Sequence, residues 1–360
     1  MQTTRFTRLP GLALAVMLML LVGQGLVFGN DDRLDSCNAG TVMVLATFNP
    51  ANQELPDGIA VIPGHGNHPG TPIVGFNPKG QAVYVAPDGS YTNYATFSSF
   101  TSSDRLLGLD SDRDGNVYLA VALFVPTTPG DPLPGIYKVA AGSDTPTRFS
   151  SPCTPPMTLP NGIELVGTDL YVADSNGFIF KVDSSGNTVL WSNHPSLVGN
   201  QAACPVPLQT PRPFGADGIA HDEHNVYITN FDYGRIVRFP IKRDGTAGTP
   251  VTVVQSCAYQ GAKGIAVDKH GSLLFNSQLN NTLYRVAPDG TVTVLLSGKP
   301  PFDQPGNMRI DGHGKHKRLL VPNFARNSVL ANNNPLVQLL SIELGNCPGD
   351  DGDDDDSHGD

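Results

Sequence analysis

The feature of the chain that most constrains its fold is a motif that recurs six times, at intervals of about 50 residues. Each copy places Gly-Ile-Ala, or a close variant, before an Asp-containing turn and an apolar segment of the type Val-Tyr-Leu-Ala. A polar loop, a segment of the type Leu-Tyr-Arg-Val, an Asp-Gly turn and a last apolar segment follow. The copies begin at residues 57–60, 107–110, 161–164, 217–220 and 263–266, with a weaker sixth copy at 306–311.

Short β-rich segments bounded by Asp-Gly turns are typical of antiparallel hairpins. Segments 117–120, 170–173 and 226–229 read as second strands of their copies, and 83–85 and 283–286 as third strands. Four strands in each of six copies predict an all-β fold, a six-bladed β-propeller of four-stranded antiparallel blades over residues 38–347. The 39 Gly and 31 Pro among 360 residues are too many for a helical bundle.

The ring is predicted to close through an N-terminal strand at 41–48, which would lie outermost in the last blade beside a C-terminal strand near 336–344. This pairing would bring Cys37 close to Cys347, and we expect a disulfide there that fastens the ring. The other cysteines fall in connections leading into inner strands, so Cys204 could pair with either Cys153 or Cys257.

Residues 1–29 have the layout of a secretory signal peptide, with Arg5 and Arg8 before an apolar run that is densest at 12–22. An uncleaved membrane anchor is the alternative, but this dense part is too short to span a bilayer. We therefore expect export to the periplasm or the extracellular space, no membrane span after cleavage, and disulfides permitted by an oxidising compartment.

The formal net charge of −10 is concentrated at the C-terminus, where 350–360 holds seven Asp and no Lys or Arg. Residues 348–360 are predicted to form a disordered acidic tail, with weak calcium binding as the alternative. The remaining propeller is nearly balanced in charge, which argues against nucleic acid as a partner. We expect a monomer.

Candidate site residues follow from the repeat, because every inner strand of a propeller starts on one face, beside the central axis. The residue before each Gly-Ile-Ala should therefore point into a shared funnel; these residues are Asp57, Leu107, Asn161, Asp217, Lys263 and Gly306. The ends of the second strands should form another ring, made of Asp174, Asn230, Asn276 and Asn323.

Oxygen ligands from opposed carboxylates and amides suit a hard cation, so Asp57, Asn161 and Asp217 are predicted to hold a divalent metal ion. Calcium is the first candidate, with magnesium or zinc as alternatives. Lys263 could replace a cation on its side of the funnel or steer an anionic ligand. The competing interpretation is structural, since Asp or Asn before Gly also starts a turn at little cost.

Asn161-Gly162-Ile163, followed one copy later by Pro213-Phe214-Gly215-Ala216-Asp217-Gly218-Ile219-Ala220, resembles the gluconolactonase, regucalcin and senescence-marker lactonase family. The repeats also resemble non-catalytic NHL-type propellers. The first resemblance implies a cation on the axis held by Asn161 and Asp217, with Asp217 as the base that activates water. Asp57 stands where that family has Glu, and Leu107 stands near the place of a further Asn.

The resemblance to the gluconolactonase family implies a metal-dependent hydrolase in which Asp217 is catalytic and the substrate is a small lactone or ester. Lys263 and the second ring, Asp174, Asn230, Asn276 and Asn323, would orient that substrate. The alternative is a non-catalytic NHL-like propeller that binds a small ligand or a protein partner at the same face.

Two further motifs have residues that could bind a metal ion. Asp110-x-Asp112-x-Asp114-Gly115 matches the start of a calcium loop, but Val121 stands where the loop needs Glu, which favours a simple turn. The pairs His65/His68 and His313/His316 could meet in neighbouring blades and bind a transition metal, although histidines flanked by Gly are usually solvated.

Overall fold

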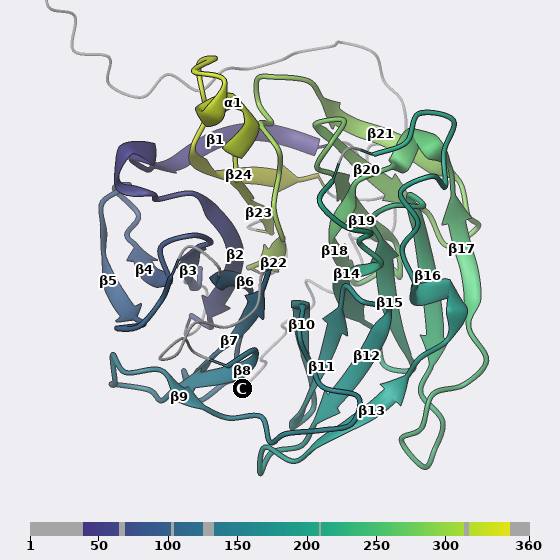
Figure 1. Ribbon diagram of the computed structural model, residues 1–360. Helices are drawn as coiled ribbons and strands as arrows, with labels where there is room; N and C mark the ends of the chain where they lie inside the picture. Colours follow the sequence, from purple (N-terminus) through teal and green to yellow (C-terminus); the bar gives the residue numbers. More distant parts are fainter. Residues whose placement is uncertain are drawn as a thin grey trace, which may run out of the picture.

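The computed structural model describes residues 39–64, 69–101, 104–124, 133–208, 210–312 and 317–345. Its strands form six four-stranded antiparallel sheets arranged as blades around a central axis (Figure 1). This confirms the predicted six-bladed β-propeller. The proposed signal peptide, the acidic tail and the two histidine pairs lie outside the described residues.

Within each of the first three blades the strands run outward from the axis in chain order. They are β2 (Pro56–Ile62), β3 (Thr71–Phe76), β4 (Gln81–Val85) and β5 (Tyr91–Thr96); β6 (Asp104–Ser111), β7 (Val117–Leu123), β8 (Gly135–Val139) and β9 (Thr147–Arg148); and β10 (Pro160–Val166), β11 (Asp169–Asp174), β12 (Phe178–Val182) and β13 (Thr188–Ser192).

Blades four and five repeat this order, and the sixth blade takes its outermost strand from the N-terminus. Their strands are β14 (Ala216–His221), β15 (Asn225–Asn230), β16 (Arg235–Pro240) and β17 (Val251–Gln255); β18 (Ala262–Val267), β19 (Leu273–Ser277), β20 (Thr282–Val286) and β21 (Val292–Ser297); and β22 (Arg309–Asp311), β23 (Arg318–Asn323), β24 (Gln338–Leu344) and β1 (Ala39–Thr47). The only α-helix among these described segments is α1 (Arg326–Leu330), and short 3-10 turns lie at Pro50–Asn52, Pro195–Leu197 and Cys257–Tyr259.

The predicted ring closure is confirmed by the pairing of β1 with β24, which runs from Ala39 opposite Leu344 to Thr47 opposite Gln338. The expected Cys37–Cys347 disulfide falls on residues outside the described part. Cys204 is bonded to Cys257, which decides between its two possible partners, and Cys153 is a free thiol.

The repeated glycines allow the inner strands to pack against one another at the axis. A Cβ atom on Gly58 would lie 1.8 Å from the carbonyl oxygen of Leu107, and one on Gly218 would lie 1.9 Å from that of Lys263. Both glycines lie inside strands rather than in turns. The glycine of the motif is therefore required by close backbone approach between neighbouring blades. Asp57 and Asp217 also lie inside these strands, which differs from the alternative interpretation that they start turns.

The core lies between adjacent blades, where apolar side chains from facing sheets interdigitate. Between blades four and five, for example, Tyr227 and Ile236 pack with Phe275 and Tyr284 in one buried cluster. The rings of Phe275 and Tyr284 stack with centroids 4.9 Å apart. Because each blade buries a face against both neighbours, the ring is stabilised as a whole.

The hairpin between β6 and β7 of blade two uses Asp112 as a turn residue, as the turn interpretation of the calcium-loop motif predicted. Asp112 Oδ1 accepts hydrogen bonds from the backbone N–H groups of Asp114 and Asn116, at 3.1 and 2.9 Å. Asp110 lies in the preceding strand and does not join this turn. Asp112 thus lies in the turn and Asp110 in the strand before it, so the two do not form one loop around a calcium ion.

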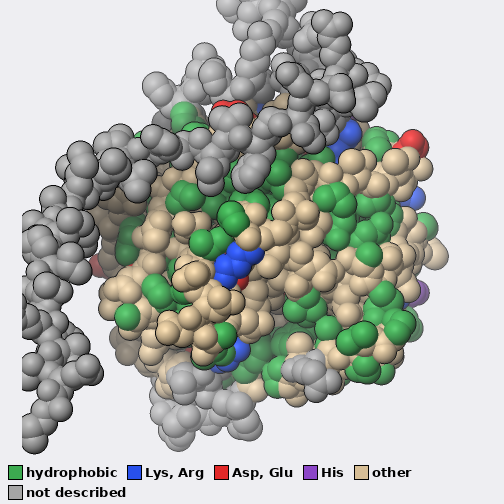
Figure 2. Space-filling view, turned by 90° about the horizontal axis from the view of Figure 1, so that it is seen from above, with side chains coloured by type: hydrophobic (Ala, Val, Ile, Leu, Met, Phe, Trp, Pro, Cys, Tyr) green, Lys and Arg blue, Asp and Glu red, His purple; other side chains and the backbone are tan. Residues whose placement is uncertain are grey.

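Figure 2 shows few Lys, Arg, Asp or Glu side chains on the part of this side of the molecule that is drawn in colour. This fits the low charged fraction of 16%. None of the helices in the described part is both long and apolar enough to span a bilayer.

Replacing Gly218 by Ala should destabilise the fold severely, because the added Cβ would collide with the backbone of the next blade. A matched control is Gly271→Ala, at an open turn position with φ +78°. The control should cost about 1 to 2 kcal/mol through backbone strain alone. Urea unfolding of both variants tests this, and equal losses would contradict the packing argument.

The Cys204–Cys257 disulfide closes a loop of 53 residues that contains all of blade four. Cys204→Ser should therefore lower the free energy of unfolding by about 2 to 4 kcal/mol. Cys153→Ser, which removes the free thiol, should change it little. Thermal unfolding under non-reducing conditions compares the two, and similar losses would show that the loop closure is unimportant.

Candidate functional site

Four of the six predicted funnel residues meet at the axis. Asp57, Asn161, Asp217 and Lys263 come from the inner strands β2, β10, β14 and β18, and their exposed fractions are 2 to 4%. The strand pairing is irregular at this point in each of these blades, as between Ala216 and Ile219 in blade four. Such bulges redirect side chains, which explains how a residue of the innermost strand reaches the axis.

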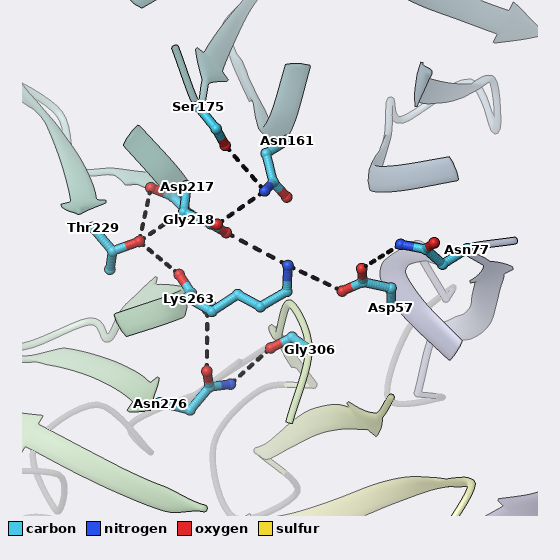
Figure 3. Close-up of polar contacts among 11 residues, drawn as sticks. Asp57, Asn77, Asn161, Ser175, Asp217, Gly218, Thr229, Lys263, Asn276 and Gly306 are labelled. Atoms are coloured by element: carbon cyan, nitrogen blue, oxygen red, sulfur yellow. Dashed lines mark hydrogen bonds and ion pairs between the residues drawn. The ribbon is translucent and has the colours of Figure 1, made fainter. Parts of the chain in front are cut away.

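The centre of this axial cluster is the ammonium group of Lys263. Its Nζ lies 3.2 Å from Asp57 Oδ1 and 3.6 Å from Asp217 Oδ1, so one cation is shared by carboxylates of two blades (Figure 3). Burial lowers the pKa of Lys263, but the charges of Asp217 and Asp57 outweigh burial and raise the pKa overall. The side chain therefore stays positively charged at neutral pH.

Asp217 is the carboxyl group of this axial cluster whose pKa is raised toward neutrality. Burial raises its pKa to about 6, Lys263 opposes this shift, and the negative charge of Asp57 adds to it. A general base works best when its pKa lies near the working pH. Asp217 can thus bind and release a proton in the range where most enzymes operate.

Side-chain amides fix the orientation of both carboxylates. Asn161 Nδ2 donates to Asp217 Oδ2 at 2.9 Å, and Asn77 Nδ2 donates to Asp57 Oδ2 at 2.8 Å. Asn161 Nδ2 also contacts Ser175 Oγ at 3.3 Å. Each carboxylate therefore has one oxygen held by an amide and the other facing Lys263.

Asn77 and Ser175 were missed by the sequence interpretation. Each lies one residue beyond the last residue of its second strand, β3 or β11. The strand pairing makes them equivalent, since Pro56 pairs with Phe76 in blade one and Pro160 pairs with Asp174 in blade three. Aligning the second strand of blade one with those of the other blades would have indicated Asn77, which follows this strand directly.

The predicted second ring is only partly brought to the axis. Asn276 belongs to it, because its Nδ2 donates to the carbonyl of Gly306 at 2.8 Å and its Oδ1 accepts from Gly264 N at 3.2 Å. Asn276 pairs one residue earlier than Asp174 and Asn230 do, and side chains alternate between the faces of a strand.

Asp174, Asn230 and Asn323 instead hold the loops that lead into their own blades. Asp174 Oδ2 accepts from the backbone N–H groups of Thr158 and Leu159, both at 2.9 Å. Asn230 Nδ2 donates to two loop carbonyls, and Asn323 Nδ2 donates to one more. With these groups engaged by the backbone, the geometry favours a structural role over the predicted ligand-binding role.

A small apolar cluster is formed by residues of blade two and of the loops that lead into blades three and four. Leu107 and Leu159 are buried in it with Ala122, and Phe124 and Phe214 pack against it. Leu107 brings no polar atom to the site, as its sequence implied.

A divalent metal ion does not fit this donor set while Lys263 is in place. The oxygens free of hydrogen bonds are Asp57 Oδ1, Asn161 Oδ1 and Asp217 Oδ1, and Lys263 Nζ already lies beside two of them. In the described ranges, no three His, Cys, Asp or Glu side chains gather as metal ligands usually do. The ammonium would repel a metal ion placed among these oxygens.

A second ionic cluster, which the sequence did not indicate, crosses the axis from the sixth blade. Arg309 Nη1 lies 2.8 Å from Glu164 Oε2, and Nη2 lies 3.5 Å from Asp110 Oδ2. Nη2 also donates to the carbonyl of Ile163 at 2.7 Å. His221 Nδ1 contacts Glu164 Oε1 at 2.9 Å, and this hydrogen bond raises the pKa of His221.

Comparisons with known proteins extend to the fold alone. The structure aligns with the gluconolactonase of Xanthomonas campestris at TM-score 0.58 and 13% identity, covering 90% of this chain and 98% of that one. It aligns with the calcium-binding protein regucalcin of Agrobacterium tumefaciens at 0.56 and 14%, covering 82% and 92%.

The PQQ-bound aldose sugar dehydrogenase of Streptomyces coelicolor is similar at 0.56 and 15%, covering 86% and 99%. No protein-family model matches the chain. No curated protein matches it either. The chain therefore shares a six-bladed propeller with gluconolactonases and regucalcin, and the same fold also occurs in a dehydrogenase.

Replacing Lys263 by Met should destabilise the protein by about 3 to 5 kcal/mol at pH 8, because two buried carboxylates lose their cation. The loss should shrink toward pH 5. The pKa of Asp217 in the folded protein is raised to about 6. Its protonated carboxyl group therefore favours the folded state, and this contribution to the free energy of unfolding is lost as pH rises through that value.

Urea unfolding at both pH values measures this effect. The control is Lys181→Met, which removes a partly exposed pair with Asp169 and should cost at most about 1 kcal/mol. A Lys263 variant with the same small loss at both pH values would show that the axial ion pairs do not support the fold.

Proposed function

We propose that the chain is a hydrolase that acts on a small lactone or ester at the axial funnel. The observation that carries the proposal is the placement of Asp217, whose pKa is raised to about 6, beside the ammonium of Lys263. A proton acceptor and a fixed positive charge at one point are what water attack on a carbonyl requires. The fold shared with a gluconolactonase supports the substrate class.

In this mechanism Asp217 takes a proton from a water molecule as that water attacks the substrate carbonyl. Lys263 stabilises the negative charge that develops on the carbonyl oxygen. Asn161 holds Asp217 Oδ2 and so fixes the direction of Asp217 Oδ1. The small apolar cluster with Leu107 and Phe214 would take the hydrocarbon part of the substrate.

The mechanism departs from the metal-dependent one that the sequence predicted. The regucalcin of similar fold is described as calcium-binding, which favours a divalent cation in a related funnel. In this chain Lys263 already supplies positive charge to the two carboxylates. We therefore propose that hydrolysis proceeds without calcium, magnesium or zinc.

A non-catalytic propeller that binds a small ligand or a protein partner is the second candidate. The observation that favours it is the burial of the axial cluster, whose four residues are at most 4% exposed. Binding of small lactones or aryl esters without their hydrolysis would support this candidate.

We further propose that the protein is exported, as its N-terminal sequence predicts, and that it acts as a monomer in the periplasm or outside the cell. The Cys204–Cys257 disulfide is compatible with an oxidising compartment.

Wild-type protein should hydrolyse at least one member of a lactone and aryl-ester panel, and EDTA should leave the rate unchanged. kcat/KM should rise with pH around a midpoint of about 6, because Asp217 must be ionised to accept a proton. Asp217→Asn should lower kcat/KM about 100-fold or more. The control Asp183→Asn changes a solvent-exposed turn and should keep full activity.

Two results would contradict the proposal. If the Asp217→Asn variant were as active as wild type, Asp217 could not be the general base. If EDTA abolished activity, the metal-dependent mechanism would be supported instead. Steady-state kinetics across pH 5 to 8 distinguishes these results.

A further inference from the structure

We infer that Lys263 is a built-in substitute for a divalent cation, and that removing its side chain converts the axial cluster into a calcium site. The inference concerns the charge and donor atoms of the cluster and does not depend on hydrolysis of a lactone. It predicts that the wild-type cluster rejects calcium, and that a single substitution makes it bind.

Charge balance is the first argument. With Lys263 present, the two carboxylates and the ammonium carry a net charge of −1 when all are ionised. Without Lys263 the charge is −2, which one Ca²⁺ would neutralise. Two buried carboxylates without a counter-charge are unfavourable, so the variant cluster has a strong electrostatic demand for a cation.

The donor atoms are the second argument. Asp57 Oδ1, Asp217 Oδ1 and Asn161 Oδ1 are buried, and apart from the Lys263 ammonium no group in the described part of the chain pairs with them. Carboxylate and amide oxygens are the ligands calcium prefers, and water can complete its coordination in the space left by the lysine side chain. The partner oxygens, Asp57 Oδ2 and Asp217 Oδ2, are already tied to amides of Asn77 and Asn161.

The backbone at position 263 is the third argument, because it allows the side chain to be removed without rebuilding the strand. The carbonyl of Lys263 accepts a hydrogen bond from Thr229 Oγ1 at 2.7 Å, and this contact does not involve the side chain. Lys263→Ala keeps it. The carboxylates and amides come from other strands and keep their own backbone supports.

The experiment is calcium titration of full-length protein by isothermal calorimetry at pH 7.5, with thermal unfolding measured in parallel. Lys263→Ala should bind one Ca²⁺ at least about 100-fold more tightly than the axial site of the wild type, and its Tm should rise with calcium. Lys181→Ala, which removes a surface lysine, is the matched control and should behave as wild type.

The seven aspartates of residues 350–360 are present in every variant, so any heat from them is common to all. The double variant Lys263→Ala/Asp217→Asn lacks one axial carboxylate and should lose the gained binding. That variant therefore locates the site.

If Lys263→Ala does not fold without calcium, recovery of its β-sheet circular dichroism on adding CaCl₂, but not on adding NaCl of equal ionic strength, supports the inference. Failure to fold in both salts would overturn it. Axial calcium binding by wild type that Asp217→Asn abolishes would also overturn it, as would a folded Lys263→Ala that binds no more calcium than the double variant.

Discussion

The close approach of six inner strands around one axis is the constraint on which the rest of the structure depends. At Gly58, Gly108 and Gly218 the space for a side chain is already taken by a backbone carbonyl of the next blade. Only glycine permits this spacing, and the spacing brings side chains from separate blades within contact of one another. A wider ring would leave Lys263 out of reach of Asp57, which belongs to a blade that does not precede or follow its own along the chain.

The close packing of the inner strands buries charged side chains at the axis, and this burial changes their pKa values. Lys263 and Arg309 each face two carboxyl groups, and burial raises the pKa of Asp217 and Asp110 to about 6. Buried ion pairs contribute little net stability compared with apolar packing, although removing one partner of such a pair is strongly destabilising. The two clusters differ in surroundings: the carboxylates of the Lys263 cluster are held by side-chain amides, and the Arg309 cluster contacts backbone carbonyls and His221.

Much of this arrangement could be predicted from the sequence, because a repeat makes one assignment apply six times. The blade order, the closing strand and the meeting of Asp57, Asn161, Asp217 and Lys263 all followed from the Gly-Ile-Ala register. What could not be predicted were features that depend on a shift of one residue. Asp174 and Asn230 resemble Asn276 in chain position, yet strand pairing places them on the opposite face. Arg309 was hidden because the sixth copy of the repeat is degenerate and its partners lie in other blades.

The two axial cations have a consequence for how this protein can evolve. Lys263 of blade five reaches blades one and four, and Arg309 of blade six reaches blades two and three, so together they cross-link every blade. Propellers can gain or lose blades by duplication or deletion of one repeat, since each blade mainly contacts its neighbours. Here such a change would alter the distance across the ring and leave a buried Lys263 or Arg309, or one of their carboxylates, without its partner. The number six is therefore specified electrostatically as well as sterically, and drift in blade count would have to wait until both cations had been replaced by neutral side chains.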